Sequence, residues 1–137
     1  MNNVTSLPLS KHRKQRKRQK FDSRGGVIVM SRNMLNHENY LSLTAQAKVL
    51  MNLMQQHWHD EKEIDYGVRE ASKKIPCSKK TAMKAFKQLE EHGFIENASP
   101  AIFSSRTQSR TRTWRLTWMP FCGRDPTHKW EKWTNEN

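Results

Sequence analysis

Residues 77–97 read CSKKTAMKAFKQLEEHGFIEN, and their pattern indicates most of the architecture that the sequence predicts. The stretch opens with small residues, continues with apolar residues at helical spacing, and breaks at a glycine. Ser78 is suited to cap a helix, because a serine hydroxyl accepts a hydrogen bond from a free backbone N–H of the first turn. Gly93 is suited to end that helix, since glycine adopts the left-handed conformation without strain.

The helix predicted over residues 79–91 has an apolar face and a cationic face. Its apolar positions follow the i, i+3, i+4, i+7 spacing of one buried stripe. They are Ala82, Ala85, Phe86 and Leu89. The residues off this stripe are Lys79, Lys80, Thr81, Met83, Lys84 and Lys87. Such a face is typical of a solvated core helix, and it also suits a helix that lies against a polyanion.

A preceding helix is predicted over residues 66–74, with Val68, Ala71 and Ile75 facing inward. Pro76 ends it, because proline disfavours helical geometry in the residue before it. Two helices joined by a tight turn form a helix-turn-helix, in which the second helix fits the DNA major groove.

A wing is predicted after these helices. Residues 94–97 are predicted as a strand and residues 98–110 as a long polar loop. Residues 111–119 alternate as a β-strand does, with Trp114, Leu116 and Trp118 on one face and Thr113, Arg115 and Thr117 on the other. Strand, basic loop and strand make a wing that can reach a minor groove or the DNA backbone. The arginines suited to that contact are Arg106, Arg110 and Arg112.

The segment upstream of residue 66 is predicted to complete the core. Residues 27–30 are predicted as a short strand, residues 31–42 as a short helix, and residues 60–65 as an acidic loop. Residues 45–58 are predicted as a core helix capped by Thr44. The inward residues of the short helix are Met34, Leu35 and Tyr40, and the stripe of the core helix is Val49, Leu50, Leu53, Met54, His57 and Trp58. The fold class is therefore mainly α with a small β-sheet (α+β), a winged helix-turn-helix over residues 25–134.

The chain is strongly basic, and its charge is uneven. Its 137 residues carry a net charge of +12, of which residues 11–24 alone carry +7. Because a block of like charge repels itself and has no apolar face, residues 1–24 are predicted as a disordered arm. We expect this arm to contact phosphates, a solubilising tail being the alternative. Its candidate contacts are Arg13, Lys14, Arg16, Lys17 and Arg18.

Several functional classes lack their sequence signals. No apolar run approaches the ~20 residues of a membrane span, and the N-terminus has no signal-peptide core. Paired carboxylates, a Gly-rich phosphate loop and a nucleophile motif are all missing, so we expect no enzyme and no cofactor. His57 and His59 would point to different sides of a helix, which argues against a metal site. Cys77 and Cys122 are predicted as reduced cytoplasmic thiols.

The order of these segments resembles a family of small winged-helix proteins carried by bacterial prophages and other mobile elements. The resemblance covers about residues 25–133. It is carried by GGVIVMSRNML (25–35), LSLTAQAKVLMNLM (41–54), YGVREASKKIPCSKKTAMKAFKQLEEHGFIE (66–96) and TWRLTWMPFCGRDPTHKW (113–130). The chain is also similar to the DNA-binding portions of plasmid and phage replication initiators. The resemblance implies DNA binding by the second helix and the wing, whereas the basic arm departs from the family pattern.

We therefore expect a sequence-preferring double-stranded DNA-binding protein of a mobile element, located at the bacterial nucleoid in the cytoplasm. It would act in transcription regulation or replication control, as a monomer or as a dimer formed on DNA. Major-groove contacts are expected from Ser78, Lys79, Lys80, Thr81, Met83 and Lys84, and phosphate contacts from Lys73, Lys74 and Lys87. The alternative is an interaction protein that binds a host polymerase or nuclease complex, and RNA is a further candidate partner of the arm.

Two tryptophans near the end of the sequence, Trp130 and Trp133, have two interpretations. The favoured one is a short helix within residues 127–134 that packs back onto the sheet, because a small core needs large apolar area. The other is an aromatic platform for unpaired bases.

Overall fold

The computed structural model describes residues 24–107 and 109–135, and for residues 99–104, 109 and 110 it describes the backbone alone. Apart from Arg24, the predicted basic arm lies outside the described residues. The helices are α2 (Arg32–Leu35), α3 (Glu38–Leu41), α4 (Ala45–Gln55), α5 (Val68–Lys74), α6 (Lys79–Glu91) and the 3-10 helix η1 (Lys129–Lys132). The strands are β1 (Ile64–Asp65), β2 (Ile95–Ser104) and β3 (Ser109–Leu116).

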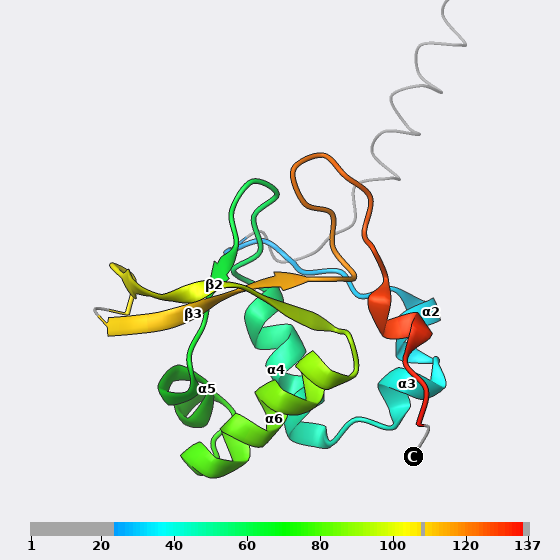
Figure 1. The fold of residues 1–137 in the computed structure, drawn as a ribbon, viewed down its shortest axis with the longest axis horizontal. Coiled ribbons are helices and arrows are strands. Elements are labelled where there is room, and N and C mark those ends of the chain that lie inside the picture. The colour runs from blue at the N-terminus through cyan, green and yellow to red at the C-terminus, as the bar shows by residue number, and fades with distance from the viewer. Residues whose placement is uncertain (1–23, 108, 136–137) are drawn as a thin grey trace, which may run out of the picture.

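The predicted α+β class is confirmed. The three strands form one antiparallel sheet in the order β1-β3-β2, so β3 is central. β2 and β3 pair from Ile95 with Leu116 to Ser104 with Ser109, and Ile64 of β1 pairs with Trp114. Helices α4, α5 and α6 lie together on one side of this sheet (Figure 1).

Helix α6 has the bounds that its cap and its stop signal predict. The Ser78 hydroxyl accepts a hydrogen bond of 3.1 Å from the Thr81 N–H. All four residues of the predicted apolar stripe are buried: Ala82, Ala85, Phe86 and Leu89. Gly93 follows with a φ of +81°, and a Cβ atom there would lie 2.9 Å from the Lys129 carbonyl oxygen. Glycine is therefore required where the chain turns from α6 into β2.

Helix α4 is capped by Thr44 as predicted, but it ends at Gln55 rather than residue 58. Leu50 and Met54 are buried, whereas Val49 is 39% exposed and His57 is exposed as well. The predicted stripe is thus wrong at these two positions. His57 lies beyond the helix, and Val49 lies on its outer side. Helix α5 likewise starts later than predicted, at Val68.

Two predictions for the segment before α4 are wrong. Residues 27–30 form no strand, and Val27, Ile28 and Val29 are exposed. A strand needs a neighbouring strand to accept its hydrogen bonds, and an apolar run alone supplies none. Residues 31–42 form two short helices instead of one, because His37 interrupts the first and caps the second, accepting a 3.0 Å hydrogen bond from the Asn39 N–H.

The region predicted as an acidic loop, residues 60–65, contains β1, and the region predicted as a long loop, residues 98–110, is mostly strand. Strand β2 continues to Ser104 across two register shifts, which leaves a short turn before β3. Thr113 and Thr117, predicted on the face opposite Trp114, are buried as Trp114 is. β3 thus has buried side chains at odd and even positions, although Arg112 and Arg115 are exposed, and the Thr117 hydroxyl donates a 2.7 Å hydrogen bond to the Gly93 carbonyl.

The C-terminal segment packs against the rest of the fold, as the favoured interpretation predicts. η1 lies beside α2 and α3 (Figure 1). Trp130 is 1% exposed and stacks on Phe94, with ring centroids 5.6 Å apart. Trp133 stacks on His92 at 3.8 Å, and the Asn39 side chain donates a 2.7 Å hydrogen bond to the Trp130 carbonyl.

Candidate nucleic-acid interface

The outer face of α6 presents a row of lysines to solvent. Lys79, Lys80, Lys84 and Lys87 are all exposed. The first three of them form no ion pair with any residue that the structure describes. Lys87 lies 3.9 Å from Glu91, and both side chains are mostly exposed. A pair so exposed is worth little, so all four ammonium groups are accessible to an external anion.

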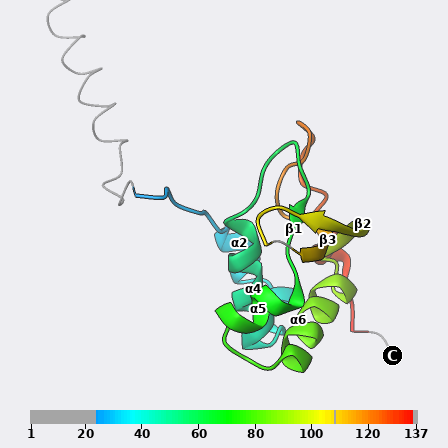
Figure 2. The same cartoon turned by 90° about the vertical axis from the view of Figure 1, so that its left-hand side faces the viewer.

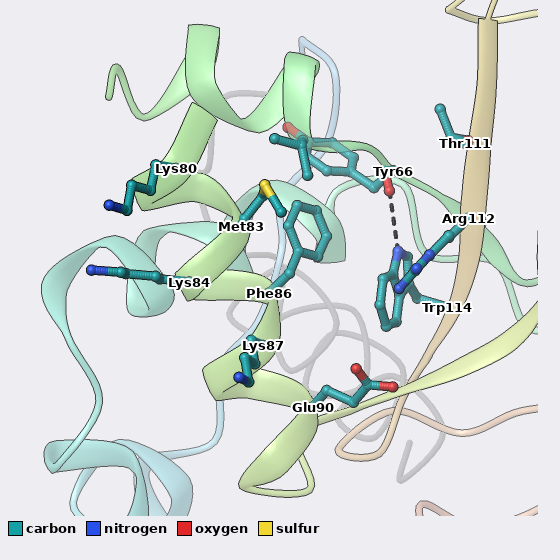
Figure 3. Close-up of a pocket in the computed structure, with 11 residues that line it drawn as sticks. Tyr66, Lys80, Met83, Lys84, Phe86, Lys87, Glu90, Thr111, Arg112 and Trp114 are labelled. Atoms are coloured by element: carbon teal, nitrogen blue, oxygen red, sulfur yellow. Dashed lines mark hydrogen bonds between the residues drawn. The ribbon is translucent and has the colours of Figure 1, made fainter. Parts of the chain in front are cut away.

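A groove of about 810 Å³ runs between α6 and β3 (Figure 3). We call it the α6–β3 groove. Its lining residues are Tyr66, Val68, Lys80, Met83, Lys84, Phe86, Lys87, Glu90, Thr111, Arg112 and Trp114. They come from α6, from β3, and from Tyr66 and Val68 at the start of α5, so the groove depends on the packing of β3 against the two consecutive helices.

The floor of the groove is aromatic. Phe86 of α6 stacks on Trp114 of β3, with ring centroids 5.4 Å apart and planes inclined by 25°. The Trp114 indole donates a 3.1 Å hydrogen bond to the Tyr66 carbonyl. Burial, reinforced by the neighbouring Glu70, raises the pKa of Tyr66 to about 12, so its phenol stays neutral at physiological pH.

The rim of the groove is mainly cationic. Lys80, Lys84 and Lys87 border it from α6, and Arg112 borders it from β3, on the other side of the aromatic floor (Figure 3). Lys84 and Lys87 also border a second hollow of about 560 Å³ along α6, so they lie on the crest of the helix between the two hollows. Glu90 is the exception to this charge, because its carboxylate would repel a phosphate at its part of the rim.

Arg106 does not extend freely from the wing. Its guanidinium forms hydrogen bonds with the Glu70 carboxylate and the Asp65 carbonyl oxygen, and its Nε lies 3.6 Å from an Asp65 carboxylate oxygen. It also lies 5.6 Å from the centre of the Tyr66 ring. The hydrogen bond with Glu70 raises the pKa of Arg106. Arg106 thus connects the turn of the hairpin to α5 and β1.

The remaining predicted contacts fall into three groups. Lys73 and Lys74 are exposed at the C-terminal end of α5, which packs against α6. The Ser78 and Thr81 hydroxyls hydrogen-bond to each other at 3.0 Å and form the cap of α6. The side chain of Arg110 lies outside the described part of the chain, as do the arm residues Arg13, Lys14, Arg16, Lys17 and Arg18.

Glu90 and the aromatic floor were not among the predicted site residues. Met83, Phe86 and Glu90 follow each other at i, i+3 and i+7, so their common side of α6 could have been inferred from helical spacing. The position of Trp114 beneath them could not, because strand alternation does not reveal which helix covers a face.

Within the described residues, no cluster of histidine, cysteine or acidic side chains is arranged to hold a metal ion. None of the helices described there combines the length and apolar character needed to cross a bilayer. Comparisons of the chain with known protein families, with curated proteins and with solved structures give no match. The features of the described residues that bear on function are the charge of the α6 face and the geometry of the α6–β3 groove.

Proposed function

We propose that this chain is a double-stranded DNA-binding protein of the winged helix-turn-helix type. One observation carries the proposal: three exposed lysines of α6 border a single groove together with Arg112 of β3, and they are Lys80, Lys84 and Lys87. A cationic surface built from a helix and an adjacent hairpin suits the two surfaces of a duplex, since the helix fits the major groove and the hairpin can reach the backbone.

The order of the elements supports the winged-helix assignment. Helix α4 is followed by β1, then by α5 and α6, then by the β2–β3 hairpin, with β3 in the centre of the sheet. Residues Ile75–Ser78 connect α5 to α6 tightly, which is expected of a helix-turn-helix. The hairpin and α6 lie at the same end of the molecule (Figures 1 and 2), so one duplex can contact both.

The contacts divide by chemistry. Lys80, Met83 and Lys84 occupy the outer face of α6 and would meet base edges in the major groove. Lys73, Lys74 and Lys87 would contact phosphates. α6 contains no arginine, although arginine is the residue that most often reads guanine through a bidentate contact. We therefore expect the affinity for DNA to depend mainly on salt-sensitive contacts with the phosphate backbone. As the resemblance to mobile-element proteins implies, we propose a role in transcription or replication control.

Genome-wide DNA footprinting of the tagged protein, followed by a mobility assay on the recovered site, tests this proposal. Discrete footprints and a salt-dependent shift of the recovered duplex are expected. Diffuse occupancy, or no shift at low salt, would contradict sequence-preferring duplex binding. Deleting residues 1–24 should make the salt dependence less steep if the basic arm contacts phosphates.

A second candidate function is binding to a host protein complex that processes nucleic acid. The observation that favours it is an exposed apolar run, Val27, Ile28 and Val29, which follows the predicted arm after Gly25 and Gly26. Exposed apolar side chains in a row are typical of protein contact sites. Capture from nuclease-treated lysate separates the two functions, because a stoichiometric protein partner retained without nucleic acid would favour the second.

A further inference from the structure

Met83 is a large apolar residue of α6, and it is exposed to solvent. Its side chain is 58% exposed, whereas the apolar stripe on the opposite side of the helix is buried. Because single exposed apolar residues are common on protein surfaces, the exposure of Met83 gains meaning only from the side chains around it.

The surroundings of Met83 indicate what it can contact. It lies one turn from Lys80 and one turn from Lys87, with Lys84 next to it in the sequence. It borders the α6–β3 groove beside Phe86, and Arg112 lies across the groove (Figure 3). An apolar contact site is therefore enclosed by cations that would hold a polyanion against it.

The major groove of DNA offers one apolar group for such a site. Guanine, cytosine and adenine present hydrogen-bond donors and acceptors there, and thymine adds a 5-methyl group. Methionine is unbranched, flexible and polarisable, so its thioether can adapt to a methyl group. Lysine supplies donors for acceptor atoms but no apolar contact.

We propose that Met83 contacts the 5-methyl group of a thymine in the major groove. This contact would give the chain a preference for thymine at the base pair that faces Met83, while the neighbouring lysines contact other bases and phosphates. This inference rests on the proposed binding of duplex DNA in the major groove. It adds a specificity-determining residue to a surface whose lysines bind mainly by charge.

The test compares two synthetic duplexes of the same length. One alternates adenine and thymine, and the other replaces every thymine with deoxyuridine, which keeps each base pair and phosphate and removes the methyl groups. The full chain is expected to bind the thymine duplex about four-fold more tightly for each methyl group contacted, the equivalent of ~0.8 kcal/mol. Equal affinity for the two duplexes would overturn the inference.

Variants separate a contact by Met83 from a property of the DNA. Met83→Gln keeps the length and the helix propensity of the residue, so it should fold normally and lose the preference for thymine. Met83→Leu should retain the preference, because it stays apolar. Leu41→Ala removes another exposed apolar residue, on α3, and should also retain it.

The outcomes distinguish this inference from the proposed function. A Met83→Gln variant that still discriminates between the duplexes would show that another group, or the DNA itself, carries the preference. If 5-methylcytosine in a G·C duplex fails to raise the affinity over cytosine, the methyl contact is likewise contradicted. If the full chain binds none of these duplexes at low salt, duplex binding itself fails.

Discussion

The guanidinium of Arg106, in the turn of the β2–β3 hairpin, forms an ion pair with the carboxylate of Glu70 on α5. The two residues are 36 positions apart in the sequence. A second carboxylate, that of Asp65 in β1, lies 3.6 Å from the same guanidinium. The turn of the hairpin is therefore fastened to the helix that precedes α6, and the charge of Arg106 is balanced within the protein.

This arrangement predicts different effects for two arginines of the hairpin, Arg106 and Arg112. Arg112→Ala should reduce the slope of log affinity against log salt by about one unit, because it removes a contact with one phosphate. Arg106→Ala should leave the slope nearly unchanged and lower the affinity through a less fixed hairpin. Titration of duplex DNA at several salt concentrations measures both quantities. A loss of slope in Arg106→Ala as large as that in Arg112→Ala would show that Arg106 contacts phosphate.

Glu90 on the rim of the α6–β3 groove should weaken DNA binding. Removing its charge with Glu90→Gln is expected to raise the affinity for duplex DNA about two-fold, the Coulomb effect of one charge several ångströms from a phosphate in water. Glu61→Gln, in the exposed turn before β1, is the matched control and should leave affinity unchanged. An unchanged or lower affinity in Glu90→Gln would place the phosphates away from this part of the rim.

Trp130 should contribute strongly to stability and not directly to binding. It is buried against Phe94 and lies outside the groove, so Trp130→Ala should lower the free energy of unfolding by about 3–5 kcal/mol. Trp133→Ala, which removes a half-buried ring, should cost less. Urea denaturation measures both losses. Equal losses for the two variants would contradict the central position of Trp130 in the C-terminal packing.

The stability of the protein should fall in mild acid, in part because of His92. Burial lowers the pKa of His92, partly opposed by Glu91, and its Nδ1 is buried without a hydrogen-bond partner. Below a pH of ~6.5 the unfolded chain takes up a proton that the folded chain resists. The contribution of neutral His92 to the free energy of unfolding is therefore fully present above that pH, and it is lost as the pH falls below it.

His92→Phe should reduce this loss, because phenylalanine keeps a ring on Trp133 and binds no proton. Chemical denaturation of both proteins at pH ~7.5 and ~5.5 makes the comparison, over the range in which histidine titrates. Partial burial of the imidazole and the nearby Arg106 also lower the pKa of His57, whose side chain is otherwise exposed, so a smaller acid sensitivity should remain in the variant. A variant as acid-sensitive as the parent chain would show that His92 contributes nothing.

The parts of the fold that the sequence predicts correctly are those set by local chemistry. Helix α6 is bounded by Ser78 and Gly93, and its buried stripe follows helical periodicity. Strand β1 was missed because Ile64 and Asp65 form a strand only through pairing with β3. The apolar run over residues 27–30 has the composition of a strand, but no strand of the described residues pairs with it.

The candidate site divides in the same way. The exposed lysines of α6 follow from the position of its buried stripe. The pairing of Arg106 with Glu70 depends on the hairpin folding back toward α5, and no local pattern records that contact. The sequence places Phe86 on the buried stripe of α6 and Trp114 on one face of a strand, but their stacking, which makes the floor of the groove, arises only when α6 packs against β3.

The central claim is that the lysines of α6 and the hairpin beside them form one surface that binds duplex DNA. The most direct measurement is the duplex affinity of the full chain carrying Lys80→Glu and Lys84→Glu, against a control carrying Lys62→Glu and Lys132→Glu, exposed lysines outside the groove. With both proteins folded, the α6 variant should lose at least about ten-fold in affinity at physiological salt, and the control should lose far less. Duplex affinity that is the same in the two proteins would contradict the claim.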